Sequence, residues 1–245
     1  MGILAYSIAD TIGFIEISNP PDNSLSDPIF EDETRLSTFL DSPELKAVLV
    51  RGRGRHFCNG ADLDSLKSQI RSNPDFASRL DKGKRLLDLF SNATIPVLAC
   101  ITGGCLGAGL ELALSCHFRF ASTNAMLGFP EASLRLMPGF GGTQTSLASV
   151  TRSRLIDLIV SSRLINGEEA HSIGLVDACS PTQTVEKDSL EFLASLVQDR
   201  PQALIRCIMC SIRNSHALPR HEAMRRESEM FVDLAHTAGA IPGVD

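Results

Sequence analysis

The sequence predicts a protein of the α/β class, because strand-like and helix-like segments alternate along the chain. Two short apolar runs closed by turn or loop residues, 45–52 and 95–102, have the character of buried strands. Apolar residues at helical spacing lie between them, over 78–91, and most of 183–236 is also helical in pattern. This order of elements, with helices concentrated near the end of the chain, is typical of an α/β arrangement.

Each element follows from a local pattern. Residues 4–18 alternate as a pair of strands with a turn at Asp10, and the Pro, Asn, Asp and Ser content of 19–27 indicates a loop. The further strands that we expect are 45–52, 95–102, 118–122, 125–129 and 175–180. The helices that we expect are 30–41, one from Leu63 capped by Asp62, 78–91, 108–115, 145–162, 166–174 capped by Asn166, and most of 183–236.

Composition narrows the classes of function. The 245 residues suffice for one large or two small domains, and 43% of them are apolar. A net charge of −6 argues against a nucleic-acid or membrane-surface role for the chain as a whole, because polyanions require an excess of Lys and Arg. We see no signal peptide and no apolar run of the ~20 residues that cross a bilayer. We therefore expect a cytoplasmic protein without nucleic-acid or membrane partners.

The cysteines favour a reducing compartment. There are seven, an odd number, scattered through apolar stretches, as expected of reduced thiols. Cys207 and Cys210 form a C-x-x-C pattern, but it lies in a helical segment, so neither a redox motif nor a metal site is favoured.

A glycine-rich stretch, GGCLGAGLELALSC at 103–116, follows the apolar run 95–102. Glycines let the backbone approach a bound group closely, and the first free N–H groups of the following helix attract negative charge. Two groups that carry such a charge are candidates for binding here: a phosphate, and an oxyanion formed during a reaction. Glu111 lies within the apolar part of this stretch, where burial raises the pKa of a carboxyl group toward the range useful for proton transfer.

A second acid, Glu131, follows Pro130 and precedes another glycine-rich turn at 139–142. Two carboxylates beside two such turns suggest a pair that moves protons around a polarised carbonyl group. The main alternative is a dinucleotide-binding G-x-G turn at Gly107 and Gly109, with Glu131 as the ribose ligand. The third glycine position holds Leu112, and the turn lies deep in the chain, so this alternative is disfavoured.

Five ordered motifs resemble the enoyl-CoA hydratase/isomerase, or crotonase, superfamily. They are NPPDNSLS (19–26), FCNGADL (57–63), IPVLACITGGCLGAGLELALSC (95–116), FPEASLRLMPGFGGTQ (129–144) and LINGEEAHSIGLVD (164–177). The resemblance covers residues 4 to about 235. It implies the crotonase (ClpP-like) fold, a spiral of ββα units with a C-terminal helical region.

The resemblance also implies roles for individual residues. The backbone N–H groups of Ala61 and Ala108 would form an oxyanion hole for a thioester carbonyl. Glu111 would deprotonate the water that adds at Cβ, and Glu131 would exchange a proton with Cα. Gly139 matches the glycine of the second turn, whose helix start also faces the thioester.

Substrate-binding positions follow in the same way. Asp62 and Leu63 lie where relatives meet the adenine of coenzyme A, and Arg53 and Arg55 are candidates for its phosphates. A solvated basic loop explains the two arginines equally well. Phe129 stands where many hydratases have Gln or Leu, and with Arg135 is a candidate for reshaping the acyl pocket. His117 replaces a usual Asp, and a structural role is favoured for it.

The expected function is reversible addition of water across the 2,3 double bond of a 2-enoyl thioester through an enolate. No cofactor is expected beyond coenzyme A as part of the substrate, and no metal. The alternatives are an enoyl-CoA isomerase, and a dehydratase or decarboxylase acting on a carrier-protein-bound polyketide intermediate. The second alternative arises because the family's usual final segment is missing from this sequence. A third is a non-catalytic binding or assembly subunit, which the presence of both acids disfavours.

The resemblance predicts two regions and an assembly. Residues 1–185 would form the core with the thioester site, and 186–245 would form a helical trimerisation region. Homotrimers, often paired into hexamers, are typical of the superfamily.

Overall fold

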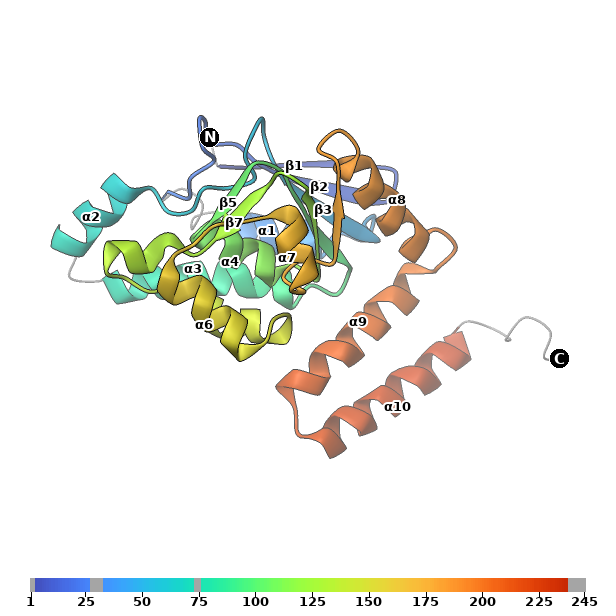
Figure 1. The fold of residues 1–245 in the computed structure, drawn as a ribbon. Helices are drawn as coiled ribbons and strands as arrows, with labels where there is room; N and C mark the ends of the chain where they lie inside the picture. The colour runs from blue at the N-terminus through green and yellow to red at the C-terminus, as the bar shows by residue number, and fades with distance from the viewer. Residues whose placement is uncertain (1–2, 27–32, 73–75, 238–245) are drawn as a thin grey trace.

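The computed structural model describes residues 3–26, 33–72 and 76–237, and its strands form two sheets (Figure 1). The larger sheet has six strands in the order β1-β2-β3-β4-β6-β9. These strands are β1 (Leu4–Ala9), β2 (Ile12–Ile17), β3 (Ala47–Gly52), β4 (Val97–Ile101), β6 (Phe118–Ser122) and β9 (Ala178–Ser180). The smaller sheet has the order β5-β7-β8, made of β5 (Gly104–Leu106), β7 (Met126–Gly128) and β8 (Ile165–Asn166).

The six-stranded sheet is parallel apart from its first strand. β1 and β2 form the expected antiparallel hairpin, and Asp10 takes a left-handed conformation at its turn (φ 54°). β2, β3, β4, β6 and β9 then pair in parallel. Every residue of β4 is buried, as its unbroken apolar run predicts for a strand covered on both faces.

Helices cover the larger sheet. α8 (Val185–Val197) packs against β3, β4, β6 and β9. α1 (Glu33–Leu40), α3 (Phe76–Ser91) and α4 (Ala108–Ser115) pack on one another in sequence and lie on the other side of the sheet in Figure 1. The first three residues of the expected helix 30–41 lie outside the described residues.

The smaller sheet includes a strand that the sequence pattern did not reveal. β5 follows β4 after Gly103, whose φ of +56° turns the chain, and it pairs in parallel with β7. Its sequence, GCL, is too short to show strand periodicity. β5 matters for function because it leads directly into α4, which carries Glu111.

The expected helix 145–162 is wrong as a single element. The segment forms α5 (Gly142–Thr145), a 3₁₀ turn (Ser146–Ala148) and α6 (Arg152–Ser161). The N–H groups of Ser149 and Val150 both donate to Ser146 O, and Thr151 is extended, so a new helix begins there. The apolar spacing continues across this break, which is why the sequence pattern concealed it.

Two shorter elements match expectation. α2 (Leu63–Ser72) begins where Asp62 accepts a hydrogen bond from the Ser65 N–H (2.7 Å). α7 (Gly167–Ser172) begins where Asn166 accepts one from the Glu169 N–H (2.8 Å). Both are side-chain caps of the kind that satisfy free N–H groups at a helix start.

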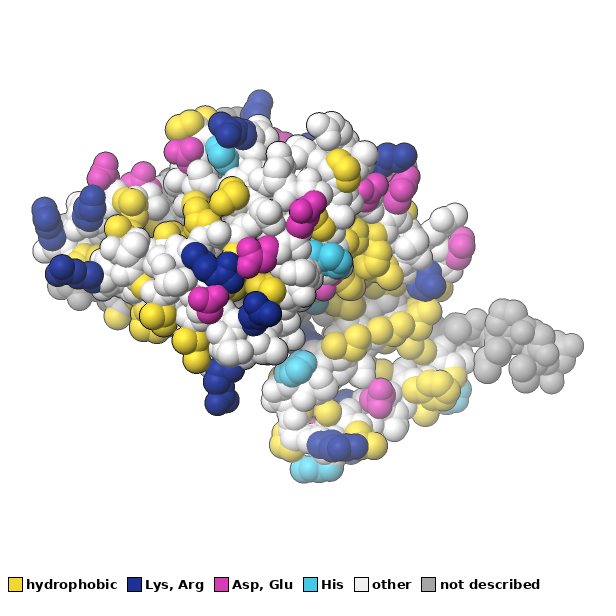
Figure 2. Space-filling view, viewed as in Figure 1, with side chains coloured by type: hydrophobic (Ala, Val, Ile, Leu, Met, Phe, Trp, Pro, Cys, Tyr) yellow, Lys and Arg dark blue, Asp and Glu magenta, His cyan; other side chains and the backbone are white. Residues whose placement is uncertain are grey.

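The C-terminal region divides into two parts. α8 belongs to the packed body, although the expected domain boundary falls at its first residue. α9 (Gln202–Ala217) and α10 (Arg220–Thr237) form a hairpin that extends away from the body (Figure 1), anchored by hydrogen bonds from Gln202 and Arg206 to backbone carbonyls at Leu40, Ser42 and Leu45. Figure 2 shows apolar side chains on the hairpin surface; the exposed ones include Ile208, Ile212, Met224 and Phe231.

Within the described ranges, no helix has both the length and the apolar character required to cross a membrane.

Candidate active site

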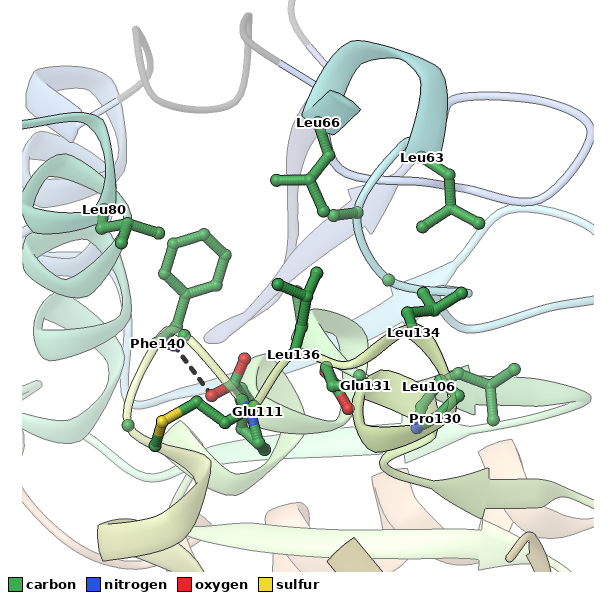
Figure 3. Close-up of a pocket in the computed structure, with 18 of the residues that line it drawn as sticks. Leu63, Leu66, Leu80, Leu106, Glu111, Pro130, Glu131, Leu134, Leu136 and Phe140 are labelled. Atoms are coloured by element: carbon green, nitrogen blue, oxygen red, sulfur yellow. Dashed lines mark hydrogen bonds between the residues drawn. The ribbon is translucent and has the colours of Figure 1, made fainter. Parts of the chain in front are cut away.

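A cavity of about 780 Å³ lies between the loop before α2, helices α2 to α4 and the segment 130–144 (Figure 3). Its polar lining includes both sequence-predicted acids, Glu111 and Glu131. It is also lined by Ala61, Ala108 and Gly139, so the structure brings all five expected catalytic residues to one cavity.

Glu111 is held in a fixed position. It lies in the first turn of α4 and is 2% exposed. Its Oε1 accepts hydrogen bonds from the backbone N–H groups of Phe140 (2.8 Å; dashed in Figure 3) and Gly142 (2.7 Å). Burial raises the pKa of the Glu111 carboxyl, and the backbone N–H groups together with the charge of Lys84 act in the opposite direction.

Glu131 has a different environment. It lies in the 3₁₀ helix η2 (Pro130–Leu134), directly after β7 and Phe129, and its Oε2 is buried without a hydrogen-bond partner among the described residues. Burial, followed by the nearby charge of Glu111, raises its pKa to about 7. A carboxyl group with this pKa exchanges a proton readily near neutral pH.

Two glycines allow the chain to pass close to these carboxyl groups. A Cβ on Gly142 would lie 3.0 Å from Glu111 Oε1 and 2.9 Å from Phe129 Cε1. A Cβ on Gly107 would lie 2.6 Å from Glu131 Oε1, and Gly107 has φ 50° and ψ −122°, a conformation that favours glycine. Glycines in the two glycine-rich turns, Gly107 in 103–116 and Gly142 in 139–142, therefore make room for the carboxyl pair.

The two expected oxyanion-hole amides come from neighbouring segments. The loop 58–61 is joined to β5 by hydrogen bonds from Leu106 N–H to Cys58 O (3.0 Å) and from Cys58 N–H to Gly104 O (3.1 Å). Among the described residues, neither the Ala61 N–H nor the Ala108 N–H has an acceptor. Ala108 is the first residue of α4, where N–H groups are free by helix geometry. Two free donors thus border the cavity beside two acids.

The rest of the cavity wall is apolar. Figure 3 shows leucines from α2, α3 and the segment 130–136 arranged around the carboxyl pair. Leu63 (46% exposed), Leu134 (46%) and Met137 (66%) are among the apolar residues that line it. Leu63 is therefore part of the wall, whereas Asp62 caps α2 and borders a smaller adjoining cavity.

Besides Asp62, three expected substrate-binding residues do not line the cavity. The Arg53 side chain is 72% exposed, and its Nε lies 3.9 Å from Glu16 Oε1. Arg55 is exposed on the same loop, and neither arginine lines the cavity. The expected contact of Phe129 with the acyl group is wrong, because Phe129 is 0% exposed and packs behind Gly142. Its contribution is to support the turn that binds Glu111.

Sequence reasoning missed several lining residues. Leu80 and Lys84 come from α3, and Phe140 comes from the second glycine turn. Helical spacing marked one face of α3 as buried but gave no sign that its edge borders a cavity. The turn at 139–142 suggested a close approach to a ligand, yet its N–H groups bind Glu111 instead.

His117 is structural, as expected. Its Nδ1 accepts the Val97 N–H (3.1 Å), and burial lowers its pKa to about 4, which keeps the ring neutral. Within the described residues, no group of His, Cys, Asp and Glu side chains has the arrangement of a metal site.

Comparison with known proteins supports the same interpretation of the motifs. Residues 7–244 match the family model described as enoyl-CoA hydratase/isomerase. A probable enoyl-CoA hydratase from Bacillus subtilis is 34% identical over 210 residues, which is 83% of this chain and 80% of the relative. A glyoxysomal fatty acid beta-oxidation multifunctional protein from Cucumis sativus is 37% identical over 192 residues, and there the match spans only 26% of the relative.

Solved structures agree with the fold. An enoyl-CoA hydratase from Bacillus anthracis superimposes with a TM-score of 0.85 at 26% identity, covering 96% of this chain and 91% of the other. This match over nearly the whole chain confirms the crotonase fold expected from the motifs. The chain belongs to the enoyl-CoA hydratase/isomerase family.

Proposed function

We propose that this chain is an enoyl-CoA hydratase, which adds water reversibly across the 2,3 double bond of a 2-enoyl thioester. One observation carries the proposal: Glu111, Glu131 and the free N–H groups of Ala61 and Ala108 border the same cavity. Hydration needs a base for water, an acid for Cα and donors for the developing oxyanion, and this cavity supplies all three.

The reaction follows from the position of each group. The thioester carbonyl oxygen accepts hydrogen bonds from the Ala61 and Ala108 amides, which draws electron density away from Cβ. Glu111 takes a proton from water as the water oxygen bonds to Cβ, and the π electrons of the double bond move to the carbonyl oxygen. Glu131 then donates its proton to Cα as the enolate collapses. A proton passing from Glu111 to Glu131 through solvent restores the starting state.

The different environments of the two acids support this division of roles. Glu111 has backbone donors that stabilise its ionised form, as a base for water requires. Glu131 has an unpartnered oxygen and a pKa of about 7, as expected of a group that holds and releases a proton. An isomerase needs to move a proton between two carbons of the substrate and has no use for an activated water, so the paired acids favour hydration.

The acyl carrier that best fits the family is coenzyme A. Arg53 and Arg55 do not line the cavity, whereas Leu63, at the start of α2, does. Carrier-protein-bound acyl chains are the alternative carrier, and the assay below includes them.

The test is a panel of 2-enoyl-CoA substrates of different length and branching, assayed by loss of the absorbance of the conjugated thioester. Wild-type protein should hydrate them, and Glu111→Gln and Glu131→Gln should each reduce kcat/KM about 10²–10⁴-fold. Parallel assays use 3-enoyl-CoA, whose isomerisation produces conjugation, and 3-hydroxyacyl carrier protein. Faster turnover in either parallel assay, or activity that survives both substitutions, would replace the hydratase assignment.

We also propose that α9 and α10 contact other copies of the chain in a homotrimer or hexamer, with residues 186–245 as the region that includes this contact. The exposed apolar residues of the hairpin support this. Light scattering coupled to size-exclusion chromatography measures the assembly, and a monomer at micromolar concentration would contradict the proposal.

A further inference from the structure

The carboxyl pair has a cationic neighbour that the motifs did not single out. Among the Lys and Arg residues that the structure describes, Lys84 is the one that lines the 780 Å³ cavity. It lies on α3, one turn after Leu80, and α3 packs against α4, the helix that carries Glu111. Leu80 in turn lies over the glycine turn, with its Cδ2 3.5 Å from where a Cβ on Gly139 would be. Lys84 is thus on the wall beside the turn that binds Glu111.

The charge of Lys84 is only weakly compensated. Its Nζ lies 3.6 Å from Asp81 Oδ1 on the same helix, and the two side chains are 49% and 65% exposed. Exposed pairs of this kind are held only weakly, so Asp81 does not fix the ammonium group of Lys84 in one place. Lys84 therefore still acts on charges in the cavity that it lines.

The other charged groups around Glu111 are few. From α3, Asp81 pairs with Lys84, and Arg79 borders the small adjoining cavity beside Phe140. From η2 comes the second acid, Glu131, whose pKa is raised in part by the charge of Glu111. The turn 139–142 and α5 contain no titratable side chain. A positive charge from α3 therefore tips the balance between two acids that cannot both ionise easily in a buried site.

We propose that Lys84 is a positioning residue whose ammonium group, on the cavity wall beside the Glu111-binding turn, keeps Glu111 the ionised member of the pair and so leaves the exchangeable proton on Glu131. This inference rests on the proposed hydratase function. In this role Lys84 acts through Glu111, by setting which of the two acids is ionised before the reaction starts. The charge of Lys84 also acts to lower the pKa of the Glu111 carboxyl, which favours the ionised carboxylate.

The experiment compares pH profiles of kcat/KM for hydration in four proteins: wild type, Lys84→Met, Lys84→Arg and Lys82→Met. Lys82 is the matched control because it lies on the same helix, is exposed and does not line the cavity. The acid limb of the profile reports ionisation of the carboxyl pair. In Lys84→Met its apparent pKa should rise by about half a unit, which lowers kcat/KM about threefold at pH values well below that pKa. Lys84→Arg should restore the limb, and Lys82→Met should match wild type.

Two further measurements separate this inference from its premise. Added salt should raise the apparent pKa of the acid limb in wild type toward its value in Lys84→Met, because salt screens the half-exposed charge of Lys84. Carbon-13 NMR titration of the labelled Glu111 carboxyl reports the same shift without any substrate. An unchanged limb and an unchanged NMR titration in Lys84→Met would overturn the role of Lys84, whereas absence of hydration in wild type would overturn the proposed function alone.

Discussion

Gly142→Ala is the substitution that probes the Glu111 environment most selectively. The backbone at residue 142 is not in a conformation reserved for glycine, so alanine introduces no backbone strain there. Its Cβ would instead lie 3.0 Å from both Glu111 Cγ and Oε1 and 2.9 Å from Phe129 Cε1. Because Phe129 is fully buried, the Glu111 carboxylate is the group that must move.

The expected size of the effect follows from the bond that is disturbed. The Gly142 N–H donates to Glu111 Oε1 at 2.7 Å, and hydrogen bonds to charged groups contribute about 1.5–3 kcal/mol. Loss of this bond should raise the Glu111 pKa by about one to two units and reduce kcat/KM for hydration about 10–100-fold. The assay is a pH profile of 2-enoyl-CoA hydration, with thermal unfolding to show that the fold persists.

A double-mutant cycle gives the control. If Gly142→Ala acts through Glu111, it should have little further effect in the Glu111→Gln background. Multiplicative losses in the double variant, or a single variant within twofold of wild type, would refute the reasoning.

The remaining predictions concern stability. The raised pKa of Glu131, about 7 in the fold, means that the folded state retains a proton that the unfolded state loses, so stability falls as the pH rises from 4.5 through 7. Glu131→Gln should remove this part of the decline, and identical pH profiles of melting temperature would contradict it. Gly107→Ala places a Cβ at φ 50° and against Glu131, and should cost about 1–3 kcal/mol in urea unfolding, where no loss would refute the strain argument. For His117, whose pKa is lowered to about 4, wild-type stability should decrease as the pH falls from 6.5 toward 4. His117→Asn, which retains an acceptor for the Val97 N–H, should show a shallower decrease in urea unfolding at pH 7 and pH 5, and an equal slope would count against the assignment.

Much of the fold could be predicted because local signals agreed with it. The apolar runs at β3 and β4, the hairpin turn at Asp10 and the caps Asp62 and Asn166 all depend on neighbouring residues, and the structure confirms each. β5 could not be found, because a three-residue strand has no period and is fixed by pairing with distant β7. The break before α6 was hidden for the opposite reason, since an apolar helical spacing continues across a segment that turns.

The site residues likewise fall into those that the sequence could predict and those that it could not. Glu111 and Glu131 were identifiable from their unusual surroundings in the sequence, and the structure places both in one cavity. Lys84, Leu80 and Phe140 were not, because their relation to Glu111 depends on how α3 packs on α4 and over the turn 139–142. Phe129 shows the limit of assigning contacts by motif position: adjacent in sequence to Pro130 and Glu131, it points into the core instead.

The most direct test of the central claim is a crystal structure with a non-hydratable 2-enoyl thioester analogue bound. The account predicts the carbonyl oxygen at about 2.7–3.1 Å from the backbone nitrogens of both Ala61 and Ala108, with Cα and Cβ between the Glu131 and Glu111 carboxyl groups. A carbonyl oxygen bound away from those nitrogens, or a chain that reaches only one of the two acids, would contradict it.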